Sequence, residues 1–220
     1  MHAQERTFLE FFEGADKRFI IPVYQRNYDW RIEHCEQLYN DILDIMKYKF
    51  KNHFIGSIVY VFDEYGEKSD LLIIDGQQRI ATISLLLLAI HNLLENGEIV
   101  SEKESLKEEI NIRYLIDKFS KSDERIKLKP VKADNQAFLK LYKNNSEDYF
   151  WESNITKNYS YFLNRIREDK ISADDLFKAI KKLTIVDIRL NSNDDDPQLI
   201  FESLNSTGLG LTQADLVRNF

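Results

Sequence analysis

The chain has 220 residues, of which 43% are hydrophobic and 30% are charged, and its formal net charge is −7. An aromatic content of 12% and frequent apolar runs argue against a disordered chain. The acidic balance argues against a histone-like coat of positive charge, although a local basic patch could still bind nucleic acid. The single cysteine, Cys35, excludes an internal disulfide and a cysteine metal cluster. The longest apolar run, residues 83–90, is too short to span a bilayer, and no secretory signal is visible. We therefore expect a cytoplasmic protein that binds no membrane.

The first half of the chain predicts both helices and strands. Residues 4–14 have the apolar spacing of an amphipathic helix, and a short strand at residues 19–21 is ended by Pro22. Two β-rich runs around a turn at residues 64–70 predict a β-hairpin. Helices are predicted before and after this hairpin, over residues 32–50 and from residue 76 to residue 94.

The second half is more helical. In chain order it predicts a helix over 101–119, a short strand in 125–130, helices over 132–144, 155–169 and 172–183, a strand over 183–190, and two helices separated by a glycine-containing turn in 192–220. These elements predict an α+β fold, with a small mixed or antiparallel β-sheet and a large helical layer over it. The last helical pattern is cut at Phe220, so we expect the chain to come from a longer protein.

A polar segment, DGQQR at residues 75–79, lies where the hairpin meets the long predicted helix. A helix N-terminus offers unpaired N–H groups and partial positive charge, and Gly76 allows a ligand or backbone to come close. Arg79 can fork onto phosphate oxygens, Gln77 and Gln78 can donate and accept, and Asp75 can hold Mg²⁺ or orient a water. These parts suit a nucleotide phosphate. In the alternative interpretation, Asp75 caps the helix and Arg79 pairs with a carboxylate.

A second segment, IPVYQRNYDW at residues 21–30, combines aromatic side chains with an amide and a guanidinium. Such side chains can stack on a base and hydrogen-bond to it, so they are candidates for sensing DNA or a DNA modification. They can equally close the end of a core with their polar tips in water. The candidate residues are Tyr24, Gln25, Arg26, Tyr28 and Trp30.

A third segment, residues 201–220, has a polar turn followed by a helix-opening pattern. Its polar side chains could form a wall of the same cleft as Arg79, or could serve only as turn and cap. The residues concerned are Asn205, Asp215, Arg218 and Asn219.

Together, "IPVYQRNYDW", "FIGSIV" followed by "IIDGQQRIATISLLLL", and "IFESLNSTGLGLTQADLVRN" resemble the N-terminal domain of GmrSD-type, modification-dependent (type IV) restriction endonucleases. The resemblance covers residues 8–220, with one small departure at Ala81, where threonine is common. It implies a ParB/sulfiredoxin-like fold, with a core over residues 1–97, a helical insertion over 98–182, and a return strand and helices over 183–220 that complete the core.

The resemblance also implies a module of bacterial phage defence that binds and hydrolyses a nucleoside triphosphate with Mg²⁺. Its implied partners are modified foreign DNA and an HNH-type nuclease that is not visible in this chain. The implied catalytic residues are Asp75, Gln77, Gln78 and Arg79, with Asp75 also a candidate for the metal. The implied nucleotide-binding residues are Gly76, Arg26, Gln25, Asn205, Asp215, Arg218 and Asn219.

Two other functions stay open from the sequence. The domain could bind DNA and sense its modification without any hydrolysis of its own, which a steep fall of affinity with salt would indicate. It could also be a non-catalytic regulatory partner in which residues 75–79 are purely structural.

Overall fold

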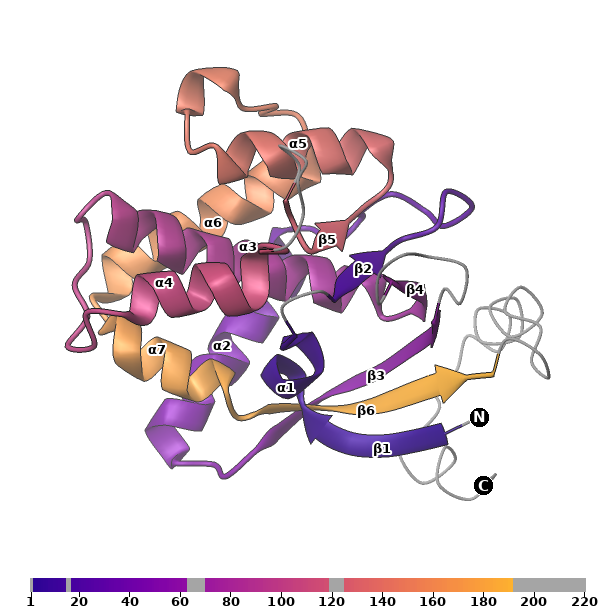
Figure 1. Ribbon diagram of the computed structural model, residues 1–220. Helices are drawn as coiled ribbons and strands as arrows, with labels where there is room; N and C mark the ends of the chain where they lie inside the picture. The colour runs from indigo at the N-terminus through magenta and orange to yellow at the C-terminus, as the bar shows by residue number, and fades with distance from the viewer. Residues whose placement is uncertain (1, 15–16, 63–69, 119–124, 192–220) are drawn as a thin grey trace.

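The computed structural model describes residues 2–14, 17–62, 70–118 and 125–191 (Figure 1). Asn205, Asp215, Arg218 and Asn219 lie outside these residues, as do the two helices predicted in 192–220. Most of the predicted hairpin turn lies outside them as well.

Six strands and seven α-helices are present in the described part of the chain. The strands are β1 His2–Thr7, β2 Arg18–Ile20, β3 His53–Phe62, β4 Asp70–Asp75, β5 Leu128–Lys129 and β6 Leu183–Leu190. The α-helices are α1 Phe8–Phe12, α2 Ile32–Tyr48, α3 Gln77–Glu95, α4 Leu106–Ile110, α5 Lys132–Tyr142, α6 Asn154–Asp169 and α7 Ala173–Ile180. A π-helix at Asn111–Leu115 follows α4, and a 3₁₀ turn at Ser146–Asp148 precedes α6.

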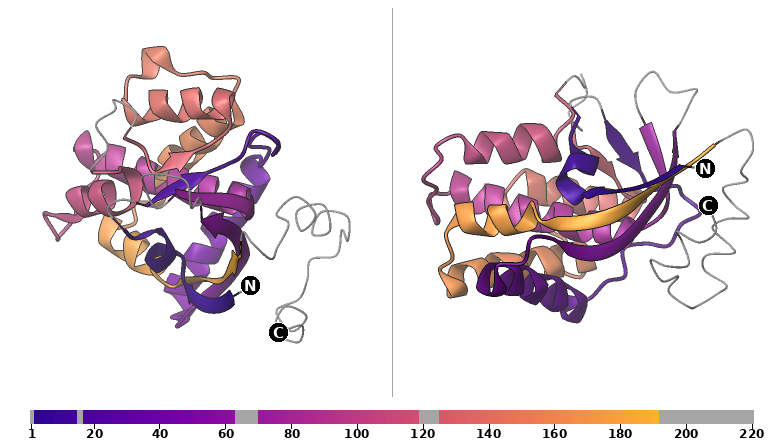
Figure 2. Two further views of the ribbon diagram at one scale, coloured as in Figure 1. Left: turned by 45° about the vertical axis from the view of Figure 1, so that its right-hand side comes forward. Right: turned by 90° about the horizontal axis from the view of Figure 1, so that it is seen from below.

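The strands form one mixed sheet in the order β1-β6-β3-β4-β2-β5. β3 and β4 pair antiparallel, which confirms the predicted hairpin, whereas β6 runs parallel to β3 and β2 runs parallel to β4. Figures 1 and 2 show the helices gathered to one side, with the long strands β1, β3 and β6 reaching away from them. The α+β prediction is confirmed, and the ParB/sulfiredoxin likeness and the internal boundaries stay predictions.

The helix predicted over residues 4–14 is wrong in its first half. Residues 2–7 form β1, which pairs antiparallel with β6, and only Phe8–Phe12 are helical. The helix begins where it does because Thr7 Oγ1 accepts from the backbone N–H of Glu10, while the Glu10 carboxylate accepts from the N–H of Thr7. This capping box is visible in the sequence as T-x-x-E, and it marks residue 7 as the helix start.

The helix predicted over residues 101–119 is shorter than expected. It begins at Leu106, changes to a π-helix at Asn111 and ends at Leu115. Beyond that point the backbone pairs with the segment before β5: Leu115 accepts from the N–H of Lys127, and Ile116 bridges Ile126. Long-range pairing therefore replaces the last helical turn.

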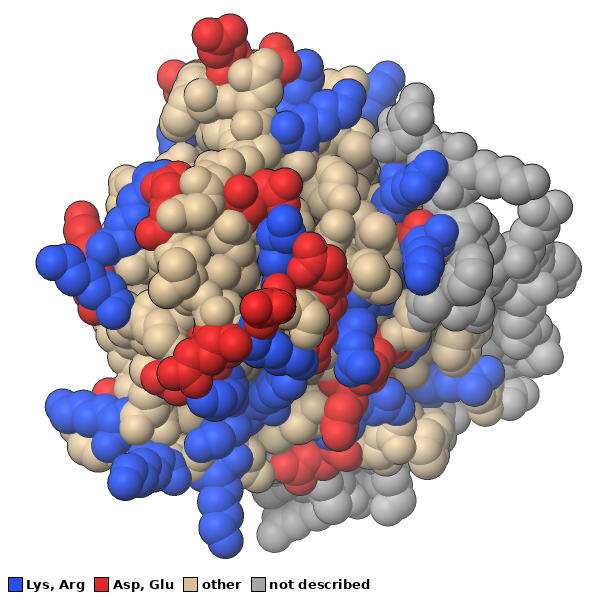
Figure 3. All heavy atoms as spheres, turned by 60° about the vertical axis from the view of Figure 1, so that its left-hand side comes forward, with Lys and Arg blue, Asp and Glu red and all other residues tan. Residues whose placement is uncertain are grey.

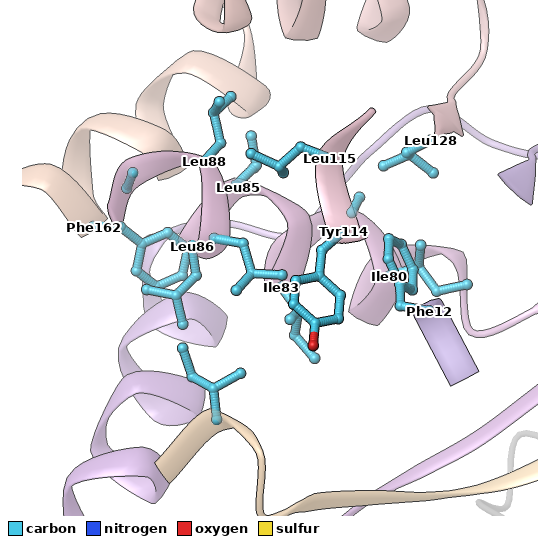
Figure 4. Packing of buried hydrophobic residues seen from close by; sticks show 14 of the residues in the cluster. Phe12, Ile80, Ile83, Leu85, Leu86, Leu88, Tyr114, Leu115, Leu128 and Phe162 are labelled. Carbon is cyan, nitrogen blue, oxygen red and sulfur yellow. The ribbon is translucent and has the colours of Figure 1, made fainter. Parts of the chain in front are cut away.

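Helix α3 runs through the centre of the molecule, and nearly all of its side chains are buried. It packs against α4, α5 and α6, and Figure 4 shows Leu86 and Ile83 lying near Phe162 and Tyr114 of its neighbours. A helix that is apolar on all sides must be surrounded, so the run of leucine and isoleucine explains its central place. No helix in the described ranges combines the length and the apolar character needed to cross a membrane.

Candidate functional site

The turn between β4 and α3 requires a glycine. Gly76 has φ +92°, and an added Cβ there would lie 3.0 Å from the carbonyl oxygen of Ser57 and from Cγ1 of Ile58 on β3. A left-handed backbone packed this closely disfavours any side chain. Gly76 therefore lets α3 start directly beside β3, with the N-terminal N–H groups of the helix at the carboxyl end of β4.

Arg79, in the first turn of α3, lies across the backbone of β3. Its Nη2 donates to the carbonyl oxygen of Ser57 at 2.7 Å and to Oδ2 of Asp75 at 3.3 Å. Gly56 makes room for it, because an added Cβ at Gly56 would lie 2.7 Å from Nη1 of Arg79. The guanidinium is thus held against the strand, and Asp75 is the carboxylate with which it pairs.

The charge on Arg79 is partly shielded from water. Burial lowers the pKa of Arg79, and the nearby Asp75 carboxylate opposes this effect. Its Nε is buried and has no hydrogen-bond partner in the described part of the chain. An incompletely paired guanidinium in such surroundings interacts strongly with any anion that reaches it.

Gln78 joins residues 75–79 to the loop of residues 27–30. Its Oε1 accepts from the backbone N–H groups of Asp29 and Trp30 at 2.9 and 3.1 Å. Its Nε2 donates to the carbonyl oxygen of Asn27 at 3.2 Å. The amide is therefore used to hold the loop against the start of α3.

Gln25 anchors the same loop to the sheet. The short strand β2 ends at Ile20, opposite Leu72 of β4. Farther along β4, the Gln25 amide donates to the carbonyl oxygens of Ile73 and Ile74 at 3.1 and 2.8 Å. Its Oε1 is buried without a hydrogen-bond partner among the described residues. A side chain thus continues the pairing of β4 where the backbone of β2 has turned away.

Tyr28 lies in the core and not on the surface. Its hydroxyl bonds to Oγ1 of Thr82 at 2.7 Å and accepts from Nδ2 of Asn158 at 2.9 Å. Its backbone N–H donates to Oδ2 of Asp134 at 2.6 Å, and burial raises the pKa of that carboxyl while this bond opposes the rise. Tyr28 therefore belongs to the core, as the core-closing interpretation expects, but its hydroxyl is buried and hydrogen-bonded and does not lie in water.

Two segments that are distant in sequence line one cavity of about 380 Å³, which we call the DGQQR cavity. Within it, Arg26 and Tyr24 are exposed, Trp30 is half-buried, and Gln25, Gln77 and Gln78 are buried. No carboxylate of the described residues forms an ion pair with Arg26. The structure thus brings together most of the candidates from the first two segments. The lining residues are Tyr24, Gln25, Arg26, Trp30, Asp75, Gly76, Gln77, Gln78 and Arg79.

The side chains at this cavity could hold a metal ion only if a bound ligand, such as a phosphate chain, supplied further oxygen atoms to it. The Asp75 side chain is 43% exposed, and no group of three or more histidine, cysteine or acidic side chains suited to a metal is present in the described ranges. Mg²⁺ is commonly held by one or two carboxylates together with substrate phosphates, so Asp75 fits that arrangement.

Sequence reasoning did not single out Gly56 and Ser57, the two β3 residues that seat Arg79. An isolated glycine inside a strand pattern signals close approach of another group, and "FIGSIV" contained that signal. The identity of the approaching group depends on how α3 packs on β3, and no local pattern shows this.

A comparison with known protein families gives one match. Residues 8–220 match the family model described as the GmrSD restriction endonuclease, N-terminal domain. The chain belongs to this family. No curated protein matches it. Membership in the GmrSD N-terminal family implies a role in a restriction system.

Proposed function

We propose that the DGQQR cavity binds the phosphates of a nucleoside triphosphate and hydrolyses it, as the regulatory step of a restriction system. One observation carries this proposal: two arginines and a helix N-terminus converge on one polar cavity of about 380 Å³. Helix N-termini and arginine forks both favour phosphate oxygens. Arg26 and Arg79 come from separate segments, so a phosphate chain could be held from two sides.

Each residue has a distinct part in this proposal. Arg79 and Arg26 take the charge of the phosphates, and stabilising that charge is the main task in phosphoryl transfer. Asp75 orients the attacking water or holds Mg²⁺, which would neutralise phosphate charge when bound. Gln77 positions the substrate. Gln78 acts indirectly, because its hydrogen bonds fix the loop of residues 27–30, which contains Trp30 and directly follows Arg26.

The first test is a thermal-shift titration of the whole chain with ATP, GTP, CTP and UTP, each with and without Mg²⁺. A ligand that binds only the folded state, at about 100 times its Kd, adds about 2.7 kcal/mol of stability. For a chain of this length that corresponds to a rise in melting temperature of about 5–10 °C. No rise for any nucleotide, in a cooperatively folding sample, contradicts the proposal.

Arg26→Ala is the sharper variant, because Arg26 is exposed whereas Arg79 bonds to β3. We expect Arg26→Ala to melt like the parent without ligand and to lose most of the nucleotide-dependent rise. Arg125→Ala is the matched control, since it removes an exposed arginine that does not line this cavity.

Release of inorganic phosphate, compared between the parent and Asp75→Asn, then tests hydrolysis.

The same cavity supports a second candidate function, in which the domain reads DNA or its modification. The observation in its favour is the aromatic rim, where Tyr24 is 56% exposed and Trp30 is half-buried. On the face in Figure 3, basic and acidic side chains are interspersed. A steep loss of DNA affinity with salt that Tyr24→Ala weakens, with no nucleotide effect, would select this function.

A purely regulatory partner is the third possibility. It predicts that neither nucleotide nor DNA binds, while the partner nuclease still does. The HNH-type nuclease is a proposed partner in all three cases, whereas modified foreign DNA is a partner of this chain only in the first two and is bound by the nuclease alone in the third.

A further inference from the structure

A second cavity, of about 520 Å³, adjoins the DGQQR cavity. It lies between α2 and the start of β3, and we call it the α2–β3 cavity. Trp30 and Arg79 line both cavities, so the two share a boundary at these side chains. A ligand whose phosphates lie at Arg79 therefore has a place for its remainder on the other side of Trp30. The volume falls within the usual range of small-molecule sites.

The walls of the α2–β3 cavity suit a flat, partly polar ring. Trp30 and His34 stack with ring centroids 5.4 Å apart and planes at 14°. Leu38 and Ile83, both buried, contribute apolar surface, and Ile55 adds more from β3. Flat aromatic surfaces beside apolar walls are what a nucleobase uses for stacking.

The polar groups of this cavity are few and placed together. Gln37 and Asp41 are one turn apart on α2 and therefore lie on the same side of the helix. Asp41 is half-buried, and its Oδ2 lies 3.4 Å from Nε2 of His53. An ionised carboxylate only accepts hydrogen bonds. Among the four common bases, guanine alone presents two adjacent N–H donors, N1–H and the N2 amino group, on its pairing edge.

We propose that the α2–β3 cavity binds the base of the nucleotide and that Asp41 makes guanine the preferred base. This inference rests on the proposed function, because it assumes that the phosphates lie at Arg79 and Arg26. Asp41 would accept from N1–H and the N2 amino group of the base, while Trp30 and His34 would stack on its face. Asp41 is then a specificity-determining residue, separate from the residues that hold the phosphates.

Calorimetric titration tests this with three probes, each in the presence of Mg²⁺: the β,γ-imido analogues of GTP and ATP, and inorganic tripolyphosphate. The two imido analogues differ from each other only in the base, and tripolyphosphate is an oxygen-bridged chain of three phosphates without base or sugar. We expect the GTP analogue to bind most tightly and tripolyphosphate most weakly. Asp41→Asn should weaken binding of the GTP analogue at least about tenfold, because a charged hydrogen-bond acceptor is lost. It should leave the affinity for the ATP analogue and tripolyphosphate unchanged.

Asp44→Asn is the matched control, because Asp44 is exposed on the same helix and lines neither cavity. Both substitutions are nearly isosteric, and equal melting temperatures will show that the variants fold. Equal affinity of the two analogues, or an Asp41→Asn variant indistinguishable from Asp44→Asn, overturns the inference. In those cases tripolyphosphate binding still supports the phosphate site. If none of the three probes binds, the proposed function fails, and the base site fails with it.

Discussion

Replacing Gln78 with alanine should loosen the loop of residues 27–30 and destabilise the fold. Three hydrogen bonds join this amide to backbone groups of Asn27, Asp29 and Trp30. At a net contribution of about 0.5–1.5 kcal/mol each, their loss totals about 1.5–4.5 kcal/mol. Because Asp29 is exposed, water can replace part of this bonding, and we expect a loss of about 2–3 kcal/mol.

Urea unfolding followed by circular dichroism measures this loss directly. A loss of about 2–3 kcal/mol should lower the unfolding midpoint by about 1 M at unchanged slope. Gln78→Glu should lose less, because a carboxylate oxygen can still accept from Asp29 and Trp30 while the donor to Asn27 is gone. Gln77→Ala is the control, since it removes an equally buried amide that makes no hydrogen bond to this loop. If Gln78→Ala is as stable as Gln77→Ala, other contacts hold the loop and our reasoning is wrong.

Three further predictions concern single side chains. Gly56→Ala should displace the guanidinium of Arg79, because the added Cβ would lie 2.7 Å from Nη1, and nucleotide titration should show a loss of affinity of about tenfold or more. Burial raises the pKa of the Cys35 thiol to about 12, so iodoacetamide at pH 8 should label it only after unfolding; fast labelling of the native chain would contradict this. Burial raises the pKa of the Asp134 carboxyl above its ordinary 3.8. Below pH 3.8 the carboxyl is protonated in both the folded and the unfolded chain and its burial lowers stability least, whereas above the raised pKa the buried charge lowers the free energy of unfolding. Asp134→Asn, whose amide oxygen can still accept from Tyr28, should therefore equal or exceed the parent in stability near pH 7. Urea midpoints at several pH values should show that this advantage disappears as the pH falls through 4.

The parts of the fold that sequence predicts well are those whose signal is local and repeated. The apolar-rich segment around residues 83–90 predicted α3, and two β-rich runs predicted β3 and β4. The strand β1 was missed because His2–Thr7 carries no apolar alternation. As an edge strand it is held by pairing with β6, some 180 residues away. The T-x-x-E box at Thr7 would have corrected the helix start.

In the candidate site, too, the residues with a local signal could be predicted, whereas the features that depend on tertiary packing could not. Residue chemistry pointed to Asp75–Arg79 and, as a base-stacking segment, to Gln25 and Arg26; the resemblance added a nucleotide-binding role for Gln25 and Arg26, and the structure places all of them on the same cavity. The α2–β3 cavity could not be predicted, because it exists only where α2 packs beside β3. The structural use of the Gln78 amide also depends on a loop that is 48 residues earlier in the chain.

The central claim is that the segments around Arg26 and Arg79 form one nucleotide-phosphate site, and Trp30 at its edge reports on it most directly. The chain has two tryptophans, so Trp151→Phe leaves Trp30 as the only source of tryptophan fluorescence. We predict a saturable, Mg²⁺-dependent change of this fluorescence on titration with a nucleoside triphosphate. Adding Arg26→Ala should shift the midpoint at least about tenfold, whereas Arg125→Ala should leave it unchanged. A folded protein whose Trp30 signal responds to no nucleotide, or responds equally in both variants, would contradict the account.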